Sequence, residues 1–264
     1  MNYPLSLIKS RPVDSHKGTF GTVKLLCGSS KYTGAALLCC EGALRSGCGM
    51  VKLFADEKAC APVRTRLPEV INCTPEDFLK TAAQSAVIGC GISDCYNEML
   101  ADIIKGTEIP TVIDADGINF LSAHKDLLRE AKSDIVLTPH PMEFSRLTGI
   151  EVTKINANRI GYAEEYSRLF NCTVVLKGHN TVIATPDRKT VINETGSTAL
   201  AKGGSGDVLA GVIGSLLAQG YDCHTAAVIG VYAHGKAADV LAEQYGLHGV
   251  LPSDLPKVIG KILG

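Results

Sequence analysis

The chain has 264 residues, of which 45% are hydrophobic and 20% are charged, and its formal net charge is -1. This composition suits one large α/β domain over residues 1–264, and the balanced charge excludes an electrostatic footprint for nucleic acid. No apolar run approaches the ~20 residues of a membrane helix, and the N-terminal MNYPLSLIKSRP lacks the features of a signal peptide. We therefore expect a cytoplasmic protein with no membrane and no nucleic-acid partner.

Hydrophobic patterns and turn residues predict strands that alternate with helices along most of the chain. In chain order the first half reads strand 22–27, helix 33–46, strand 50–54, strand 86–89, helix 94–105, strand 111–114 and helix 116–131. The second half reads strand 134–138, helices 142–148 and 153–170, strands 173–177, 181–185 and 190–192, then helices 206–219, 223–243 and 252–263. Between residues 56 and 79 we predict a short helix, a loop with Pro62 and Pro68, and a helix from Pro75.

Such alternation predicts a mostly parallel sheet covered by helices on both faces. The turn Pro186-Asp187-Arg188 suits a hairpin, so we expect an antiparallel pair at one edge of that sheet. In a sheet of this kind ligands gather beyond the carboxyl ends of the strands. The residues that follow the predicted strands are therefore the candidates for a site, and nearly all of them are Gly, Asp, His, Lys or Ser.

The ten cysteines form no C-x-x-C pair that would indicate zinc binding or redox work. Cys27, Cys39, Cys40 and Cys90 lie in apolar segments, where a free thiol behaves as a small core side chain. We expect them to be reduced and buried.

The segment GGSGD, residues 203–207, joins a polar stretch to an apolar helix. Gly203, Gly204 and Gly206 are expected to take backbone conformations closed to other residues and to expose several N–H groups at the positive end of the helix. This is how proteins seat a phosphate or a developing negative charge. Asp207 would then lie beside the anion, within reach of an attacking hydroxyl. The alternative is a glycine hinge in which Asp207 caps the helix.

Three further segments carry candidates, each with a purely structural alternative. In LTPHPMEF, residues 137–144, His140 could contact substrate and Glu143 could hold a metal-bound water, or both could simply begin a helix. Lys177 and Gly178 could face a nucleotide, or form a solvated hairpin. Asp114 and Asp116 could contact a metal or hydroxyl, or cap a helix.

Small residues recur elsewhere along helices. Gly34, Ala35 and Ala36 open a helix start to close approach, either by a ligand or by a packed neighbour. His234 and Asp239 are five residues apart in a later helix and do not share one face, so that helix is interpreted as packing.

Together these segments resemble the ADP-dependent NAD(P)H-hydrate dehydratases, members of the ribokinase-like superfamily. The resemblance covers nearly the whole chain and rests on HKGTFG, YTGAALLCCEGALRSGCGMV, IGCG, VIDADGIN, LTPHPMEF, VLKGHNTVI, GSTALAKGGSGDVLAG and LPSDL, in that order. It implies a ribokinase-like α/β fold and a lyase that repairs NADH and NADPH hydrated at the nicotinamide ring. The family phosphorylates the new hydroxyl from a nucleotide and then eliminates phosphate.

The resemblance also implies roles for residues. The catalytic group would be Asp207 with Gly204, Ser205 and Gly206. Ala35, Gly91, His140 and Asp207 would bind the hydrated dinucleotide. Glu143 would hold Mg²⁺ through water. The nucleotide, ADP or alternatively ATP, would be bound by Lys177, Gly178, His179, Asn180, Thr181, Ser197, Gly203 and Gly206.

Two departures from the family pattern stand out. Some members read GPG where this chain has Gly89-Cys90-Gly91, and GTGD where it has Gly204-Ser205-Gly206-Asp207. Cys90 could alter the stiffness of its loop. The family also occurs fused to a preceding epimerase domain for which this chain has no room, so we expect a separate epimerase. The resemblance further suggests that the chain forms a homo-oligomer, specifically a homotetramer.

Two other functions stay open on the sequence. A ribokinase-like kinase would stop at phosphorylation of an alcohol and leave a stable phosphoester. A nucleotide sensor would keep the fold without the chemistry, although an intact Asp207 argues against it.

Overall fold

The computed structural model describes residues 3–264, and among them nine strands form one sheet in the order β3-β2-β1-β4-β5-β6-β7-β8-β9. The strands are β1 Thr22–Leu26, β2 Met50–Phe54, β3 Ile71–Cys73, β4 Ser85–Ile88, β5 Thr111–Ile113, β6 Ile135–Leu137, β7 Thr173–Leu176, β8 Thr181–Ala184 and β9 Val191–Asn193. From β3 to β7 every neighbouring pair is parallel, whereas β8 is antiparallel to both β7 and β9. The mostly parallel sheet and its antiparallel edge are confirmed.

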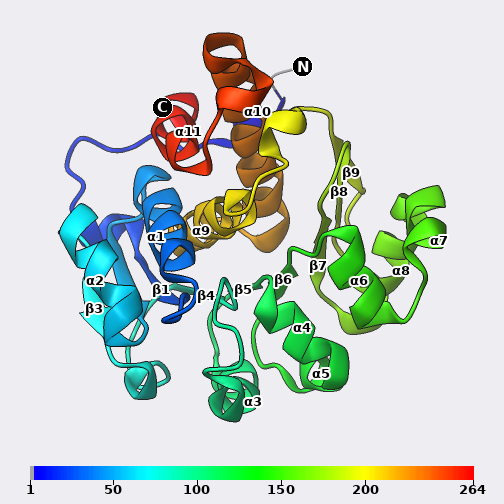
Figure 1. Ribbon diagram of the computed structural model, residues 1–264, viewed down its shortest axis with the longest axis horizontal. Helices are drawn as coiled ribbons and strands as arrows, with labels where there is room; N and C mark the ends of the chain where they lie inside the picture. The colour runs from blue at the N-terminus through cyan, green and yellow to red at the C-terminus, as the bar shows by residue number, and fades with distance from the viewer. Residues whose placement is uncertain (1–2) are drawn as a thin grey trace.

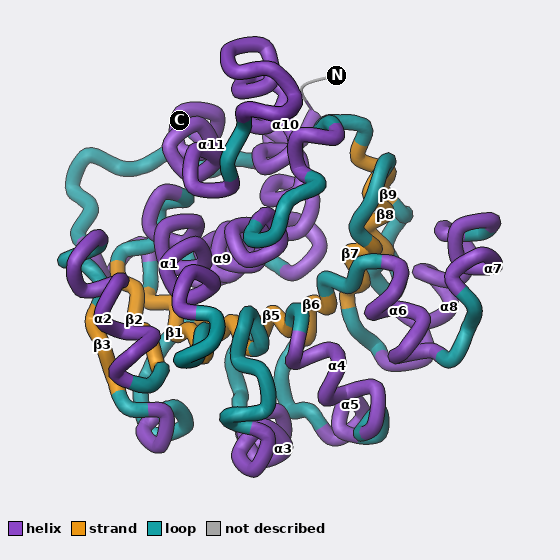
Figure 2. Tube along the Cα trace, in the orientation of Figure 1, coloured by secondary structure: helices purple, strands orange, loops and turns teal. Residues whose placement is uncertain are grey.

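The helices follow the predicted order with local differences (Figure 2). They are α1 Thr33–Arg45, α2 Glu57–Arg66, α3 Asn97–Gly106, α4 Asp116–Ala123, α5 Leu127–Glu130, α6 Pro141–Thr148, α7 Val152–Ala157, α8 Arg159–Phe170, α9 Ser205–Ala218, α10 Cys223–Gly249 with a non-helical Gly246, and α11 Leu255–Leu263. Two predicted helices, 116–131 and 153–170, are each two helices. The prediction for residues 56–79 was wrong in three respects, because α2 contains Pro62, β3 was missed, and Pro75 begins only a short 3-10 turn.

Successive side chains of a strand point to opposite faces of the sheet, and here they are buried in two separate hydrophobic cores. One core joins residues such as Val23, Leu25 and Val87 to α1, α2, α9, α10 and α11. The other joins Ile88, Ile113 and their neighbours to α3, α4, α6 and α8. Figure 1 shows α1, α9 and α10 on one side of the sheet and α3, α4 and α5 on the other. Both faces are therefore covered, as the unbroken burial of β1 and β4 requires.

The strand order reverses between β1 and β4. From β1 the chain first builds outward through β2 to β3, and then returns to place β4 on the other side of β1. Loops that leave two such strands at their carboxyl ends diverge, and the crevice between them is the usual ligand site of an open α/β sheet. Here the two loops begin at Cys27 and Gly89 and stay in contact, because the Gly28 N–H donates to the carbonyl of Cys90 at 2.7 Å.

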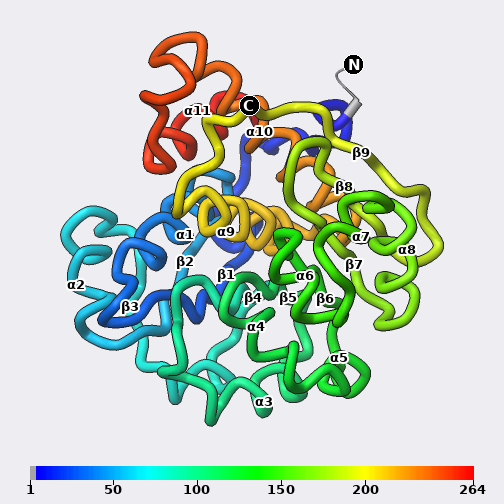
Figure 3. The backbone as a smooth tube through the Cα atoms, turned by 45° about the vertical axis from the view of Figure 1, so that its right-hand side comes forward, coloured from blue at the N-terminus to red at the C-terminus, as the bar shows by residue number. Residues whose placement is uncertain are grey.

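Helices α1 and α9 pack backbone to backbone above this crevice. A Cβ added to Gly211 would lie 2.1 Å from the carbonyl oxygen of Cys39, and one added to Gly42 would lie 2.5 Å from that of Val208. These two glycines let the helices approach more closely than side chains would allow. Figure 3 shows α9 lying across the sheet close to α1. This contact fixes the start of α9 over the strand ends. No helix in the described part of the chain is both long and apolar enough to cross a membrane.

Candidate active site

The glycine turn before α9 is built largely as the sequence predicts. Gly204 is the N-cap residue with φ 102°, and a Cβ there would lie 2.5 Å from Leu38. The N–H groups of Gly206 and Asp207 lie in the first turn, where they have no partner within the helix. The expectation of special backbone angles was wrong for Gly203 and Gly206, since only Gly204 has a positive φ. At Gly206 the glycine instead leaves room, because a Cβ would lie 3.2 Å from Lys177 Nζ.

Lys177 lies at the centre of a group of buried charges. Its Nζ is 2.7 Å from Asp114 Oδ1 and 3.8 Å from Glu143 Oε2. Asp114 Oδ1 also accepts a hydrogen bond from the Thr138 hydroxyl at 2.7 Å. The side chains of Lys177, Asp114 and Glu143 are only 19%, 2% and 7% exposed. Their segments follow β7, β5 and β6, so adjacent strand ends bring the three charges together. We call Asp114, Glu143, Lys177 and Asp207 the charged centre.

Burial and mutual charge shift the pKa values within this centre. Burial lowers the pKa of Lys177, but the carboxylates of Asp114 and Glu143 outweigh it and raise that pKa above the ordinary value. Burial raises the pKa of Glu143, and the positive charge of Lys177 partly offsets that rise. The pKa of Asp207 is raised well above the ordinary value, first by burial and then by Cys90 and Asp114. The position of Asp207 in the first turn of α9 would by itself favour the ionised carboxylate, but desolvation dominates and raises its pKa.

Asp207 does not cap its helix, since the N-cap residue is Gly204. Its carboxylate, the carboxylate of Asp114 and the sulfur of Cys90 lie within 4.8 Å of one another. The residue is partly exposed, whereas Asp114 and Cys90 are fully buried. Asp207 is therefore the member of this trio that a ligand can reach from solvent.

His140 and Glu143 do begin a helix. His140 Nδ1 accepts from the N–H groups of Met142 and Glu143, and Glu143 Oε2 accepts from the N–H of His140 at 2.8 Å. This reciprocal pair is a capping box for α6. Because Nδ1 accepts, the ring proton lies on Nε2, which is 3.3 Å from Glu143 Oε1. Burial, followed by Lys177 and Arg146, lowers the pKa of His140. The imidazole is thus neutral and held in one orientation, with its side chain still 46% exposed.

Ala35 and Gly91 lie against each other at the reversal of the strand order. A Cβ on Gly91 would be 2.5 Å from that of Ala35 and 2.9 Å from that of Tyr32. Gly91 also has φ 61°, and its carbonyl accepts from the Ser29 hydroxyl at 2.9 Å. These small residues make a tight wall between the loops that follow β1 and β4.

The loop between the antiparallel strands β7 and β8 holds Gly178, His179 and Asn180, and Thr181 begins β8. Gly178 and Asn180 have φ 141° and 55°, and the Thr181 hydroxyl donates to the Gly178 carbonyl. Arg159, which was not among the predicted site residues, fixes this loop. The Arg159 guanidinium donates to the carbonyls of Leu176 and Lys177 at 2.7 and 3.1 Å. In the sequence, Arg159 is an arginine at the start of a helix with no acidic residue beside it. Local patterns do not distinguish such a residue from an ordinary surface charge.

Helix α10 holds the segment that leads into the glycine turn, so its interpretation as packing alone was incomplete. Asp239 accepts from the Gly196 N–H at 3.0 Å, and His234 Nε2 lies 3.0 Å from the carbonyl of Ser205. Ser197 and Ser205 have hydroxyls that are buried without a hydrogen-bond partner among the described residues. Both hydroxyls belong to predicted site residues, and unpartnered buried hydroxyls suit a bound polar ligand.

The predicted residues thus fall into separate groups rather than one continuous network. The structure joins Gly206, Lys177, Glu143 and His140, and separately joins Ala35 to Gly91. Among the described residues, no hydrogen bond or ion pair links the 178–181 loop to Ser197 or Gly203.

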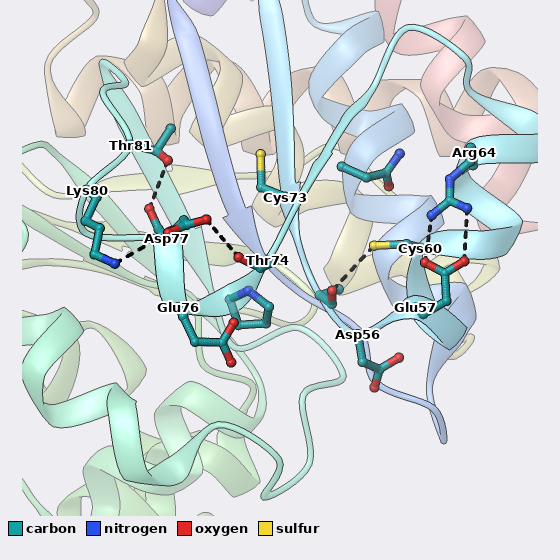
Figure 4. A pocket seen from close by; sticks show the side chains of 13 residues that line it. Asp56, Glu57, Cys60, Arg64, Cys73, Thr74, Glu76, Asp77, Lys80 and Thr81 are labelled. Atoms are coloured by element: carbon teal, nitrogen blue, oxygen red, sulfur yellow. Dashed lines mark hydrogen bonds and ion pairs between the residues drawn. The ribbon is translucent and has the colours of Figure 1, made fainter.

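A surface hollow of ≈ 690 Å³ lies away from all of these residues, between α2 and β3 (Figure 4). It is lined by charged side chains such as Glu57, Arg64, Asp77 and Lys80. Arg64 and Glu57 form a direct ion pair at 2.9 Å, and their side chains are 53% and 75% exposed to solvent. No predicted site residue lines this hollow, and its ion pairs face water, so shape alone does not identify the candidate site.

A mostly parallel sheet with a glycine turn and an aspartate opening a helix over its carboxyl edge defines the class, a ribokinase-like protein. Within that class the family is also shown. A family model described as NAD(P)H-hydrate dehydratase matches residues 23–261, and the chain belongs to this family.

Individual relatives agree with that assignment. An ADP-dependent (S)-NAD(P)H-hydrate dehydratase of Neisseria meningitidis is 40% identical over 91% of this chain and 84% of its own. A crystal structure of the ADP/ATP-dependent NAD(P)H-hydrate dehydratase of Bacillus subtilis, co-crystallised with ATP/Mg²⁺, matches with a TM-score of 0.90 and 31% identity over 99% of this chain and 95% of that one. A bifunctional NAD(P)H-hydrate repair enzyme of Thermofilum pendens is 34% identical over 99% of this chain, which spans 53% of that relative.

Proposed function

We propose that this protein is an ADP-dependent lyase that restores NADH and NADPH from their hydrates. The observation that carries the proposal is that the charged centre and the first turn of α9 meet at the carboxyl edge of the sheet. The dehydratase names of relatives matched over most of the chain support it over a kinase that stops at phosphorylation or a sensor without chemistry.

Asp207 would accept the proton of the ring hydroxyl as that oxygen attacks the terminal phosphorus of ADP, and the bond from this phosphorus to the bridging oxygen would break to release AMP. The raised pKa of Asp207 supports this role, because a carboxylate with a higher pKa is a stronger base. The N–H groups of Gly206 and Asp207 would stabilise the charge on the transferring phosphoryl, with Gly204 and Ser205 shaping the turn. The lone pair of the ring nitrogen would then expel phosphate, which carries the hydrate oxygen, and leave an iminium ion. Loss of a proton from the ring carbon next to the iminium carbon would regenerate the dihydronicotinamide.

The neutral, oriented imidazole of His140 would contact the hydrated dinucleotide, with Ala35 and Gly91 forming the wall on the β1–β4 side. The nucleotide would lie along the 177–181 loop and Ser197, and would reach Gly203 and Gly206 with its phosphates. The positive φ of Gly178 and the unpartnered hydroxyl of Ser197 support this placement.

A magnesium ion fits the charges of the centre. Three carboxylates, Asp114, Glu143 and Asp207, face one ammonium, Lys177, and the neutral His140 does not balance them. Oxygen donors are the ligands that Mg²⁺ prefers, and it commonly keeps several waters. Glu143 would hold the ion through water, and the ion would supply charge neutralisation to the phosphates of the nucleotide. The Bacillus subtilis relative was crystallised with ATP/Mg²⁺.

The test is recovery of the near-ultraviolet dihydronicotinamide absorbance from hydrated NADH, with ADP, with ATP and with neither. We expect recovery only with a nucleotide, matched mole for mole by released phosphate, and faster with ADP. Recovery without nucleotide, or a stable phosphoester in place of restored NADH, would contradict the proposal.

We further propose that residues 1–264 act as one domain, as a cytoplasmic homotetramer, and in partnership with a separate NAD(P)H-hydrate epimerase. Exposed apolar side chains near the end of α10, such as Tyr245 and Leu247, support self-association, and ten free cysteines support a reducing compartment. The bifunctional relatives, about twice as long as this chain, support a partner activity. Light scattering of the purified protein tests the tetramer, and a monomer at micromolar concentration would refute it.

A further inference from the structure

Three thiols that are far apart in the sequence meet beside the charged centre. Cys27 follows β1, Cys90 follows β4, and Cys39 lies on α1, and all three are fully buried. Their sulfurs lie within 4.8 Å of one another, and those of Cys27 and Cys39 are 3.7 Å apart. We call Cys27, Cys39 and Cys90 the thiol cluster.

The spacing of the sulfurs fits ligands of one soft metal ion. Two thiolates bound at about 2.3 Å to a tetrahedral zinc ion are about 3.8 Å apart. The Cys27–Cys39 separation already has this value, and the third sulfur needs to move by less than about 1 Å to complete a three-thiolate set. Backbone contacts hold the set in place, since the Gly28 N–H donates to Cys90 and α1 is packed against α9 through Gly211.

Other buried cysteines lack this arrangement. The thiols of Cys48 and Cys60 contact backbone carbonyls of Ala43 and Ala55 at 3.4 and 3.5 Å. Cys40, next in sequence to Cys39, is equally buried but is not part of the cluster. The cluster is therefore not a general consequence of a cysteine-rich core.

The cluster is connected to the candidate active site. The sulfur of Cys90 is 3.7 Å from Asp114 Oδ2 and within 4.8 Å of a carboxylate oxygen of Asp207. Asp207 is partly exposed, whereas the three thiols are fully buried. Cys90 is thus the member of the thiol cluster that also contacts the carboxylates of the charged centre.

We infer that the thiol cluster is a binding site for a soft divalent cation of the Zn²⁺ or Cd²⁺ type, and that occupancy inhibits the enzyme through Cys90, which lies beside Asp114 and Asp207. Binding replaces the three S–H protons, which are released to solvent, by three metal–sulfur bonds. When the sulfur of Cys90 moves toward the ion, its contacts with the carboxylates of Asp114 and Asp207 change, and Asp207 is the group that would accept the proton of the attacking hydroxyl. The binding site stands on the sulfur geometry alone, whereas the inhibition rests on the proposed function.

Cadmium is the probe for binding, because cadmium thiolates absorb in the ultraviolet. The reduced, metal-free full-length protein is titrated with Cd²⁺ against a competing chelator. We expect one tight site per chain, with about 100-fold weaker binding in Cys39→Ala. Cys40→Ala is the matched control, equally buried and adjacent in sequence, and should bind as tightly as the native chain. Cys27→Ser is a second test should Cys39→Ala fail to fold.

Equal affinity of native and Cys39→Ala protein, or the same loss in Cys40→Ala, would overturn the site. The activity arm separates this idea from the proposed function. Cd²⁺ should inhibit the native enzyme and Cys40→Ala but not Cys39→Ala, and excess Mg²⁺ should not relieve the inhibition. Inhibition that persists in Cys39→Ala would place the ion at the magnesium position instead. Absence of activity before any Cd²⁺ is added would count against the proposed function and leave the binding result intact.

Discussion

The charged centre and the hollow between α2 and β3 contain the same kinds of residue in opposite surroundings. In the centre, Lys177 and Asp114 are 19% and 2% exposed and 2.7 Å apart. In the hollow, Lys80 and Asp77 are 76% and 55% exposed and 3.5 Å apart. Water screens the second pair, whereas burial strengthens the first and displaces the pKa values of its neighbours. Burial of charge, rather than the size of a depression, therefore distinguishes the charged centre from the hollow.

The largest effect is expected at Asp207. Asp207→Asn keeps the shape of the side chain but removes the proton acceptor, so the turnover number should fall by about 10³-fold while nucleotide affinity is retained. Steady-state kinetics and calorimetric binding of ADP measure the two quantities. Asp77→Asn in the hollow is the matched control and should keep native turnover. Near-native turnover of Asp207→Asn would remove Asp207 from its proposed role.

Breaking the buried pair should cost stability. Lys177→Met leaves Asp114 and Glu143 without their ammonium, and we expect the free energy of unfolding to fall by on the order of 3 kcal/mol. Urea denaturation measures this change, and adding Asp114→Asn should restore part of it. The comparison variant Lys80→Met should unfold like the native protein. A Lys177→Met protein of native stability would show that the centre is as well solvated as the hollow.

Protonation of His234 should make the stability of the fold depend on pH. Burial lowers its pKa to about 4, whereas an exposed histidine has a pKa of about 6.5. Because the unfolded chain binds a proton more readily, stability is complete above pH 6.5 and is lost as the pH falls toward 4. We expect His234 to account for a loss of about 2 kcal/mol between pH 7 and pH 5. Urea denaturation at both values should show this loss in the native chain and a smaller one in His234→Gln. An identical loss in both proteins would contradict the assignment.

The smallest effect is expected in the hollow. Arg64→Gln removes the ion pair with Glu57, whose two partners are solvent-exposed. Turnover should stay within about twofold of native and the melting temperature should not change measurably. A large loss of activity in this variant would make the hollow a functional site and would reverse the comparison.

Local signals explain why much of the fold was predictable. Strands such as β1 and β4 are continuous buried runs closed by glycine, and the α9 start is marked by its glycines and by the apolar helix that follows. The capping box of His140 and Glu143 is likewise local, since it lies within four consecutive residues. In each case, the residues that decide the structure are neighbours in the chain.

The remainder depends on contacts that sequence spacing does not encode. Lys177 and Asp114 are 63 residues apart, and so are Cys27 and Cys90, and only the strand order brings each pair together. The raised pKa of Asp207 required knowledge of its burial. The edge strand β3 is exposed or only partly buried along its length, so it lacks the continuous apolar run that predicts the equally short β5 and β6.

The central claim is that the ring hydroxyl is phosphorylated before it leaves. The most direct measurement is the fate of its oxygen, using hydrated NADH prepared with oxygen-18 in that hydroxyl and one enzyme turnover with ADP. The account predicts that the label appears in the released inorganic phosphate. Label found in water, with ADP cleaved separately or not at all, would contradict phosphoryl transfer to the hydroxyl and with it the role proposed for the charged centre.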